Sequence, residues 1–215
     1  MGALKGEKRM KFTKLYFVLL LSLTAQQTLA AGDAAAGKAL YGTCVACHGA
    51  NGEGNISLNS PAIGGQDAGY IERQLLNFKS GKRGADASDT YGMQMRGMAS
   101  TLADASAVAN VAAYIAGMPA GVAAAVEYDQ RNGENQYNAA CGACHGGKGE
   151  GNVALNAPRL AGLDAVYLKR QYQNFASGLR GSAADDRYGK QMQLMATMLA
   201  SDKDLDDVIG FLLDQ

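Results

Sequence analysis

The chain has 215 residues, with 20 Lys and Arg against 20 Asp and Glu, 2 His, 4 Cys and no Trp. The first 30 residues hold five of the basic residues and one of the acidic ones, which leaves 15 basic and 19 acidic residues and a formal charge of −4. A mildly acidic chain has no basic surface for nucleic acid, so that class of partner is excluded. All His and Cys lie in two short motifs, which leaves none for a histidine-dependent mechanism or a thiol nucleophile.

Residues 1–30 have the pattern of a secretory signal peptide. A basic segment at residues 8–11 precedes an apolar stretch at residues 15–23, and small residues near Ala30 offer a cleavage site. The alternative is an uncleaved membrane anchor, but a membrane-spanning helix needs about 20 apolar residues and this stretch is shorter. We expect cleavage, and an exported mature chain without a membrane span, which in a bacterium is periplasmic.

The rest of the chain is an internal duplication. Residues 44–118 align with residues 141–215 at an offset of 97 without a gap, and 35 of the 75 pairs are identical. One inserted residue extends the match upstream, where Gly37 and Tyr41 pair with Gly133 and Tyr137. A unit of about 90 residues is too long for a solenoid repeat. It predicts two domains, residues 31–118 and 133–215, joined by a linker at residues 119–132.

Each copy is expected to be helical. An N-cap at Asp67, an apolar stripe and a stop at Gly81 predict a helix over residues 67–80, with its counterpart over residues 164–177. Apolar spacing predicts a last helix in each copy, and a shorter helix is expected before each cysteine pair. No alternating strand pattern is present, so the predicted fold is all-α. Bulky apolar side chains are few, so we expect another group to fill each core.

Each copy contains one C-x-x-C-H motif, the attachment signature of c-type haem. Cysteines three residues apart on a helical turn can each form a thioether with the same porphyrin, and the next histidine then faces the iron. The alternatives are a four-cysteine zinc site, a thioredoxin-like redox pair and structural disulfides. Against them, the pairs lie in separate copies, no βαβ pattern surrounds them, and both histidines would be unexplained. We predict two covalent haem c groups, held by Cys44, Cys47 and His48 and by Cys141, Cys144 and His145.

The second axial ligand has to come from outside these motifs. Because both histidines are committed, methionine is the candidate, and Met/His ligation raises the reduction potential into a carrier's range. The repeat retains two equivalent pairs, Met95 with Met192 and Met98 with Met195. The sequence leaves both open but favours Met95 and Met192, which follow Tyr-Gly-x-Gln in an expected loop. The other pair is then expected to fill the core.

The chain from residue 31 onward resembles the cytochrome c4 family, dihaem proteins made of two class I cytochrome c domains. The matching features are residues 31–37, the haem motif followed by residues 51–55, Tyr70 with residues 73–75, residues 78–83 and the methionine-rich segment before Leu102. The resemblance implies that the axial methionines are Met95 and Met192. It also implies a hydrogen bond from each axial histidine to the carbonyl of Pro61 or Pro158. Arg83 and Arg180 match positions that pair with haem propionates, with a solvated helix-end arginine as the alternative.

The function implied by this resemblance is periplasmic electron transfer without substrate chemistry. Protein ligands on both sides of the iron leave no open position for oxygen or peroxide. The implied partners are a quinol-oxidising complex as donor and a membrane haem–copper oxidase as acceptor. The main alternative is the electron-accepting subunit of an oxidoreductase, such as a flavocytochrome sulfide dehydrogenase with its flavoprotein subunit. An enzyme in its own right, a thiosulfate dehydrogenase or a dihaem peroxidase, is disfavoured because such enzymes usually need a further His or Cys ligand.

Overall fold

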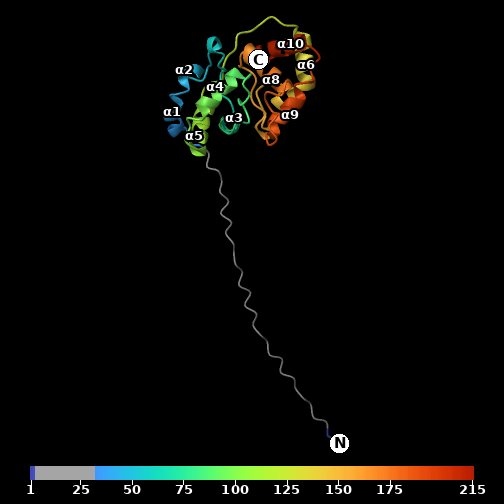
Figure 1. Ribbon diagram of the computed structural model, residues 1–215. Helices are drawn as coiled ribbons and strands as arrows, with labels where there is room; N and C mark the ends of the chain where they lie inside the picture. The colour runs from blue at the N-terminus through green and yellow to red at the C-terminus, as the bar shows by residue number, and fades with distance from the viewer. Residues whose placement is uncertain (3–31) are drawn as a thin grey trace. The chain divides into compact units, whose positions relative to one another are not determined.

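The computed structural model describes residues 1–2 and 32–215 (Figure 1), so the predicted signal peptide lies almost entirely outside the described residues. Residues 32–215 belong to one compact unit. In this part of the chain the regular structure is helical, apart from two isolated bridges, Asn55–Ser60 and Asn152–Ala157. The predicted all-α fold is confirmed. No helix among the described residues has the length and apolar character needed to cross a membrane.

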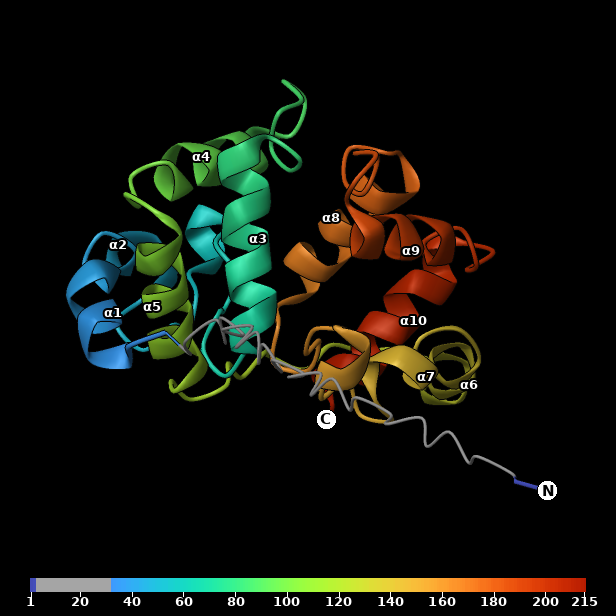
Figure 2. The ribbon, with the colours of Figure 1, turned by 90° about the horizontal axis from the view of Figure 1, so that it is seen from below.

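The helices repeat in the same order in two halves (Figure 2). The N-terminal half consists of α1 (Ala34–Tyr41), α2 (Val45–His48), α3 (Ala68–Ser80), α4 (Thr90–Ala99) and α5 (Ala105–Ala116). The C-terminal half consists of α6 (Gln130–Ala140), α7 (Gly142–His145), α8 (Ala165–Ala176), α9 (Arg187–Met195) and α10 (Asp202–Leu213). Short 3-10 turns, η1 (Ile56–Leu58) and η2 (Val153–Leu155), follow the two haem motifs. In each half the first helix packs on the last, α1 on α5 and α6 on α10.

In each of these pairs, the two helices come closest at a glycine, which has no side chain to hold them apart. A Cβ atom on Gly37 of α1 would lie 1.9 Å from the backbone oxygen of Asn110 in α5. A Cβ atom on Gly133 of α6 would lie 2.3 Å from the backbone oxygen of Asp207 in α10. Only glycine allows two helix backbones to approach this closely, which explains why both copies have it at the same place.

The predicted helix ends agree well with α3. The carboxylate of Asp67 accepts a hydrogen bond from the Tyr70 amide, and Gly81 ends the helix with a left-handed φ of 76°. In the second copy α8 stops one residue earlier than predicted, at Ala176. The predicted first and last helices of each copy are also present, as α1, α5, α6 and α10.

The loop expected around Met95 and Met192 is wrong, because both methionines lie in helices, α4 and α9. The carboxylates of Asp89 and Asp186 are the N-caps, each accepting from a glycine amide three residues later at 3.0 Å. Those glycines lower the helix propensity of both segments, so the sequence pattern did not predict these two helices. Both carboxylates are buried, so the helices depend on tertiary packing.

The segment between the halves has no regular structure from residue 118 to residue 129, and α6 takes in residues 130–132 of the predicted linker. Gly121 of this segment lies against both halves. A Cβ atom there would be 2.5 Å from the Cβ of Ala62 and 2.7 Å from the carbonyl oxygen of Gly162. The connection is therefore packed onto the two domains at their junction.

Candidate functional site

Each C-x-x-C-H motif begins a one-turn helix that follows a longer helix closely. In the N-terminal half Cys44 caps α2, and His48 is the last residue of that turn. Cys141 and His145 occupy the same places around α7. All four cysteines are among the described residues, and none is in a disulfide. Burial raises the pKa of the Cys44 thiol, and it raises that of Cys141 to about 11.

The histidine of each motif is buried and oriented by one hydrogen bond. His48 Nδ1 lies 2.9 Å from the carbonyl oxygen of Pro61, and His145 Nδ1 lies 2.9 Å from that of Pro158. Because a carbonyl can only accept, Nδ1 carries the proton and Nε2 keeps its lone pair. Burial lowers the pKa of both histidines, which favours this neutral form. The predicted contacts with Pro61 and Pro158 are confirmed.

The backbone around each histidine is fixed by a second set of hydrogen bonds. The His48 carbonyl accepts from the Gly54 amide at 2.8 Å, and the His145 carbonyl accepts from the Gly151 amide at 2.7 Å. The residue after each histidine is a glycine, whose carbonyl accepts from the hydroxyl of a buried tyrosine, Tyr41 or Tyr137. Buried backbone groups must be paired in this way, and these hydrogen bonds fix the backbone that carries each histidine ring.

Both motifs line one continuous cavity of about 360 Å³. Its walls come from core side chains of α3, α5, α8 and α10, among them Leu75, Phe78, Val111, Phe175 and Val208. Within the described part of the chain, no group of three or more His, Cys, Asp or Glu side chains is placed to share a metal ion. Paired thiols, an imidazole with a free Nε2 and apolar walls fit haem c.

The two candidate methionine pairs both reach this cavity. Met95 is half-buried and packs against the apolar core of the N-terminal half, and Met192 is half-buried at the equivalent position. Met98 and Met195 also line the cavity but are 41% and 37% exposed. The greater burial of Met95 and Met192 suits a ligand shielded from water, and the core-filling role expected for the other pair does not match its exposure.

Two buried arginines connect the halves. Arg83 is 8% exposed and Arg180 is 6% exposed, so the alternative of a solvated helix-end arginine is wrong. Each guanidinium stacks on a phenylalanine of its own half, with the central carbon 4.5 Å from the Phe78 ring and 4.4 Å from the Phe175 ring. Their donors reach partners in both halves at 2.8 to 3.3 Å, namely Gln74, Gln171, Tyr70 and Tyr167.

A second arginine pair crosses the same interface, and sequence reasoning missed it. Arg73 donates to the Asn156 carbonyl at 2.9 Å, and Arg170 donates to the Asn59 carbonyl at 2.9 Å. The Nε atoms of both arginines are buried without a hydrogen-bond partner, and both side chains line the cavity. The sequence does repeat an Arg-Gln pair, at residues 73–74 and 170–171. A contact between the two copies, however, produces no periodic pattern in the local sequence from which it could be predicted.

These four arginines share the cavity wall with two buried carboxylates, Asp89 and Asp186, so positive charge is in excess at the interface. None of these four guanidiniums forms a salt bridge with a carboxylate in residues 32–215. Although burial raises the pKa of Tyr167, the nearby Arg83 and Arg180 lower it overall. Buried charges are normally paired, so this region is suited to an anionic group that enters the cavity.

Comparison with known proteins identifies the group that fits. The chain matches the family described as Cytochrome c twice, over residues 34–119 and 130–215. It is 34% identical to cytochrome c4 of Azotobacter vinelandii over 85% of this chain and 89% of that protein. The chain belongs to the cytochrome c4 family. It therefore consists of two tandem cytochrome c domains that bind two covalent haem c groups, and members of the cytochrome c4 family are electron carriers.

Of two further comparisons, the first agrees with this assignment to the cytochrome c4 family and the second is to a protein with a different name. The crystal structure of reduced recombinant cytochrome c4 from Pseudomonas stutzeri superposes with a TM-score of 0.71 at 29% identity, covering 85% of this chain and 98% of that one. A protein named thiosulfate dehydrogenase electron acceptor, from Stutzerimonas stutzeri, is 32% identical over 83% of this chain and 84% of its own length.

Proposed function

We propose that the chain is a periplasmic carrier that takes up and releases one electron at each of two haems, without substrate chemistry of its own. The observation that carries this proposal is the repeated site, in which a buried neutral histidine is held by a proline carbonyl beside a cysteine pair and an apolar cavity. When bound, haem c supplies an iron that changes between the +2 and +3 states. The protein's part is to hold the iron's ligands in place and to exclude water.

The axial ligands in this proposal are His48 with Met95 and His145 with Met192. The thioethers are formed by the cysteines of each motif, Cys44, Cys47, Cys141 and Cys144. Support comes from the free Nε2 of each histidine and from the half-burial of the two methionines at the cavity wall. With a histidine and a methionine as ligands, the iron would have no open position for a small molecule, which suits electron transfer rather than activation of oxygen or peroxide.

The four interface arginines would pair with the haem propionates. Each haem has two carboxylates, so two haems offer four negative charges to the four guanidiniums of Arg73, Arg83, Arg170 and Arg180. The buried Nε atoms of Arg73 and Arg170 are unpaired donors at the cavity, and a carboxylate is the partner that their geometry prefers. A cation beside a propionate also favours the reduced iron, because it opposes the positive charge gained on oxidation.

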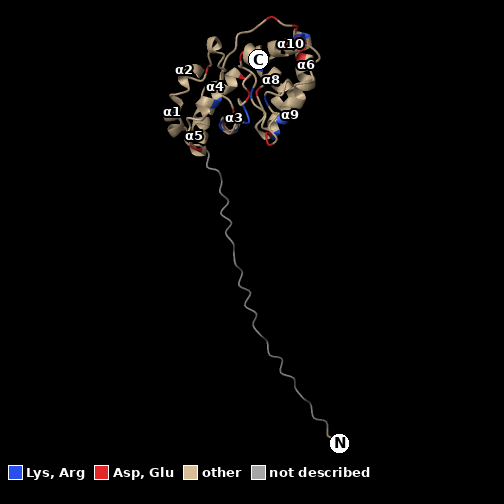
Figure 3. Ribbon diagram, viewed as in Figure 1, with Lys and Arg blue, Asp and Glu red and all other residues tan. Residues whose placement is uncertain are grey.

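The partners in this proposal are respiratory proteins, with a quinol-oxidising complex as donor and a membrane haem–copper oxidase as acceptor. Family membership and the signal-like pattern of residues 1–30 support the periplasm as the compartment. Residues 32–119 hold 6 basic and 7 acidic side chains and residues 120–215 hold 9 and 12 (Figure 3), so docking would be weak and sensitive to salt.

A second candidate is an electron-accepting subunit that works with one dedicated enzyme. The similarity to the thiosulfate dehydrogenase electron acceptor of Stutzerimonas stutzeri favours it. In the same kind of role, the chain would be the electron-accepting subunit of a flavocytochrome sulfide dehydrogenase, whose other subunit is a flavoprotein. Purification from a native extract at low salt separates the two proposals. A free chain supports the respiratory carrier, and a stoichiometric dehydrogenase or flavoprotein supports the subunit.

The proposal is tested by haem content and by the far-red absorption band of a methionine–iron bond. Pyridine haemochrome analysis should give two c-type haems per chain. Met95→Ala and Met192→Ala should each remove half of the band, while Met98→Ala and Met195→Ala serve as matched controls and should leave it intact. If Met98→Ala and Met195→Ala remove the band instead, Met98 and Met195 are the ligands and the proposed assignment is wrong.

A further inference from the structure

One contact between the halves has no counterpart in the repeat. Gln66 of the N-terminal half is 6% exposed and binds the backbone of Arg159 in the C-terminal half at two points. Its Nε2 donates to the Arg159 carbonyl at 3.0 Å, and its Oε1 accepts from the Arg159 amide at 2.8 Å. The Asp67 amide also donates to Oε1 at 3.3 Å, which fixes the orientation of the side-chain amide.

This contact lies one residue from the group that orients a histidine. Arg159 directly follows Pro158, whose carbonyl accepts from His145 Nδ1 at 2.9 Å. A side-chain amide that holds both the N–H and the C=O of one residue fixes that residue's position and its peptide plane. The Arg159 N–H belongs to the same peptide group as the Pro158 carbonyl, so the Gln66 contact directly restrains the acceptor of the His145 hydrogen bond.

The N-terminal half has the same hydrogen bond but not the same support. His48 Nδ1 lies 2.9 Å from the Pro61 carbonyl, and the next residue is Ala62. The residue equivalent to Gln66 in the second copy is Leu163, whose side chain has no amide group that could bind the backbone of Ala62. By contrast, the arginine contacts occur as reciprocal pairs and treat the two halves alike.

We propose that Gln66 is a positioning residue through which the N-terminal half orients the axial histidine of the C-terminal half. This inference rests on the proposed ligation of iron by His145. The hydrogen bond at Nδ1 sets the direction and the basicity of the imidazole, which are properties that tune the reduction potential. The coupling runs one way. The His145 site depends on the contact between the halves through Gln66, whereas within residues 32–215 no side chain of the C-terminal half bonds the backbone of Ala62 beside the His48 site.

The test uses Gln66→Leu, which gives the first copy the residue of the second, in the full chain with both haems bound. Nuclear magnetic resonance of the reduced protein measures solvent exchange of the two Nδ1 protons. Exchange at His145 should accelerate on the order of tenfold, because two hydrogen bonds that restrain its acceptor are lost. Exchange at His48 should not change. The potential of the C-terminal haem, followed by its assigned haem methyl signals during a redox titration, should shift while that of the N-terminal haem stays constant.

Two controls make the outcome decisive. Gln66→Glu keeps the size and one acceptor but sets a carboxylate oxygen against the Arg159 carbonyl, so a change confined to the same histidine is expected even if Gln66→Leu folds poorly. Equal changes at both histidines would mean a general loosening of the interface and would overturn the inference, as would no change at either. The methionine–iron band is recorded in every sample. If it persists, a negative result counts against Gln66 alone, whereas its absence from the unmodified protein would overturn the proposed ligation itself.

Discussion

The two halves have nearly the same helices and the same haem motif, yet they hold their first and last helices together differently. In the N-terminal half, the Asn110 side chain of α5 accepts one hydrogen bond, from the Asp33 amide at 2.8 Å. In the C-terminal half the equivalent residue is Asp207 of α10, a buried carboxylate that accepts from the Asp129 amide at 3.0 Å. A neutral contact in one half is thus an ionic one in the other.

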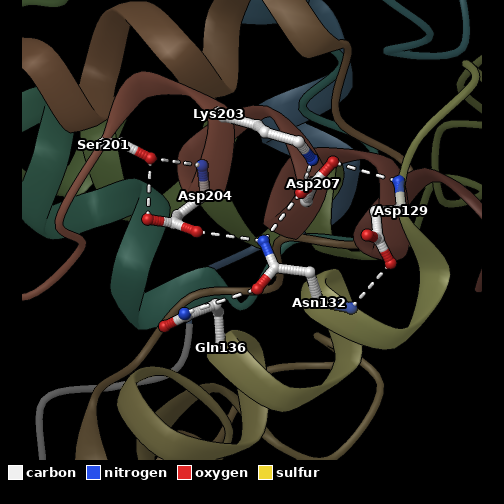
Figure 4. Close-up of polar contacts among 7 residues, drawn as sticks. All are labelled: Asp129, Asn132, Gln136, Ser201, Lys203, Asp204 and Asp207. Carbon is white, nitrogen blue, oxygen red and sulfur yellow. Dashed lines mark hydrogen bonds and ion pairs between the residues drawn. The ribbon is translucent and has the colours of Figure 1, made fainter.

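The charge of Asp207 brings a larger network with it (Figure 4). Its carboxylate also accepts from the side-chain amide of Asn132 at 2.7 Å and forms an ion pair with Lys203 at 2.5 Å. Asn132 bridges to Asp204, whose carboxylate accepts from the Ser201 hydroxyl. A buried carboxylate needs several donors to replace its lost water, and Asp207 has them in the Asp129 backbone, the Asn132 side chain and Lys203. Both halves keep the same close approach of a glycine, Gly37 or Gly133, to the backbone of the residue at this position.

That shared close approach gives the largest expected effect. Gly133→Ala should lower the free energy of unfolding by about 3 kcal/mol, because its Cβ meets the backbone of α10, which cannot move aside. Gly37→Ala should cost at least as much, since its Cβ is closer to the opposing backbone. Urea unfolding followed by circular dichroism measures both. Gly97→Ala, in α4 with open space around its Cβ, is the matched control and should be neutral or slightly stabilising.

Truncation of Asp207 should destabilise the protein more than truncation of its counterpart, Asn110. Asp207→Ala leaves the Asp129 amide, Asn132 and Lys203 without their acceptor, and we expect a loss of roughly 2–3 kcal/mol. Asn110→Ala removes one acceptor and should cost only about 1 kcal/mol. Amide hydrogen exchange in α6 and α10, compared with exchange in α1 and α5, shows which half has lost stability in each variant. Equal losses in the two variants would contradict an ionic reinforcement of the C-terminal half.

The sequence predicted the parts of this molecule that are determined locally. Caps, stops and apolar spacing located α3, α5, α8 and α10, and the haem motifs with Pro61 and Pro158 followed from their spacing and from the family. The missed helix around Met95 depends on a buried cap, Asp89, whose burial is decided by tertiary packing. Arg73, Arg170 and Gln66 were not recognised as interface residues, because their partners lie more than 80 residues away and in the other copy.

The contrast between Asn110 and Asp207 also predicts a difference in acid stability. Its hydrogen bonds to Lys203 and Asn132 lower the pKa of Asp207 to about 2. A carboxylate whose pKa is depressed by folding stabilises the native state above its unfolded pKa of about 4 and loses that contribution as the pH falls toward 2. The C-terminal half should therefore lose stability between about pH 4 and pH 2, and Asp207→Asn should remove this part of the pH dependence.

Hydrogen exchange measured at a series of pH values checks this prediction. Glu53 and Glu150 are equivalent residues whose pKa values are both lowered, mainly by backbone hydrogen bonds, so they affect the two halves alike and do not obscure the comparison. The matched variant is Asn110→Asp, which lacks a lysine because Ser106 stands where the second copy has Lys203. It should destabilise the N-terminal half at neutral pH. A pH profile unchanged by Asp207→Asn would mean that the network does not set the acid limit.

The smallest effect is expected from the ion pair between the halves, Lys82 with Asp185 at 2.8 Å. Leu179 and Ser88 occupy the equivalent positions, so this pair, like the Gln66 contact, is not repeated. The Asp185 side chain is 70% exposed, and such a pair contributes little to stability because water and salt screen it. Lys82→Leu should therefore change the free energy of unfolding only at low salt, and the difference should disappear at about 0.5 M salt. A large loss that persists in high salt would show that the lysine stem, rather than its charge, joins the halves.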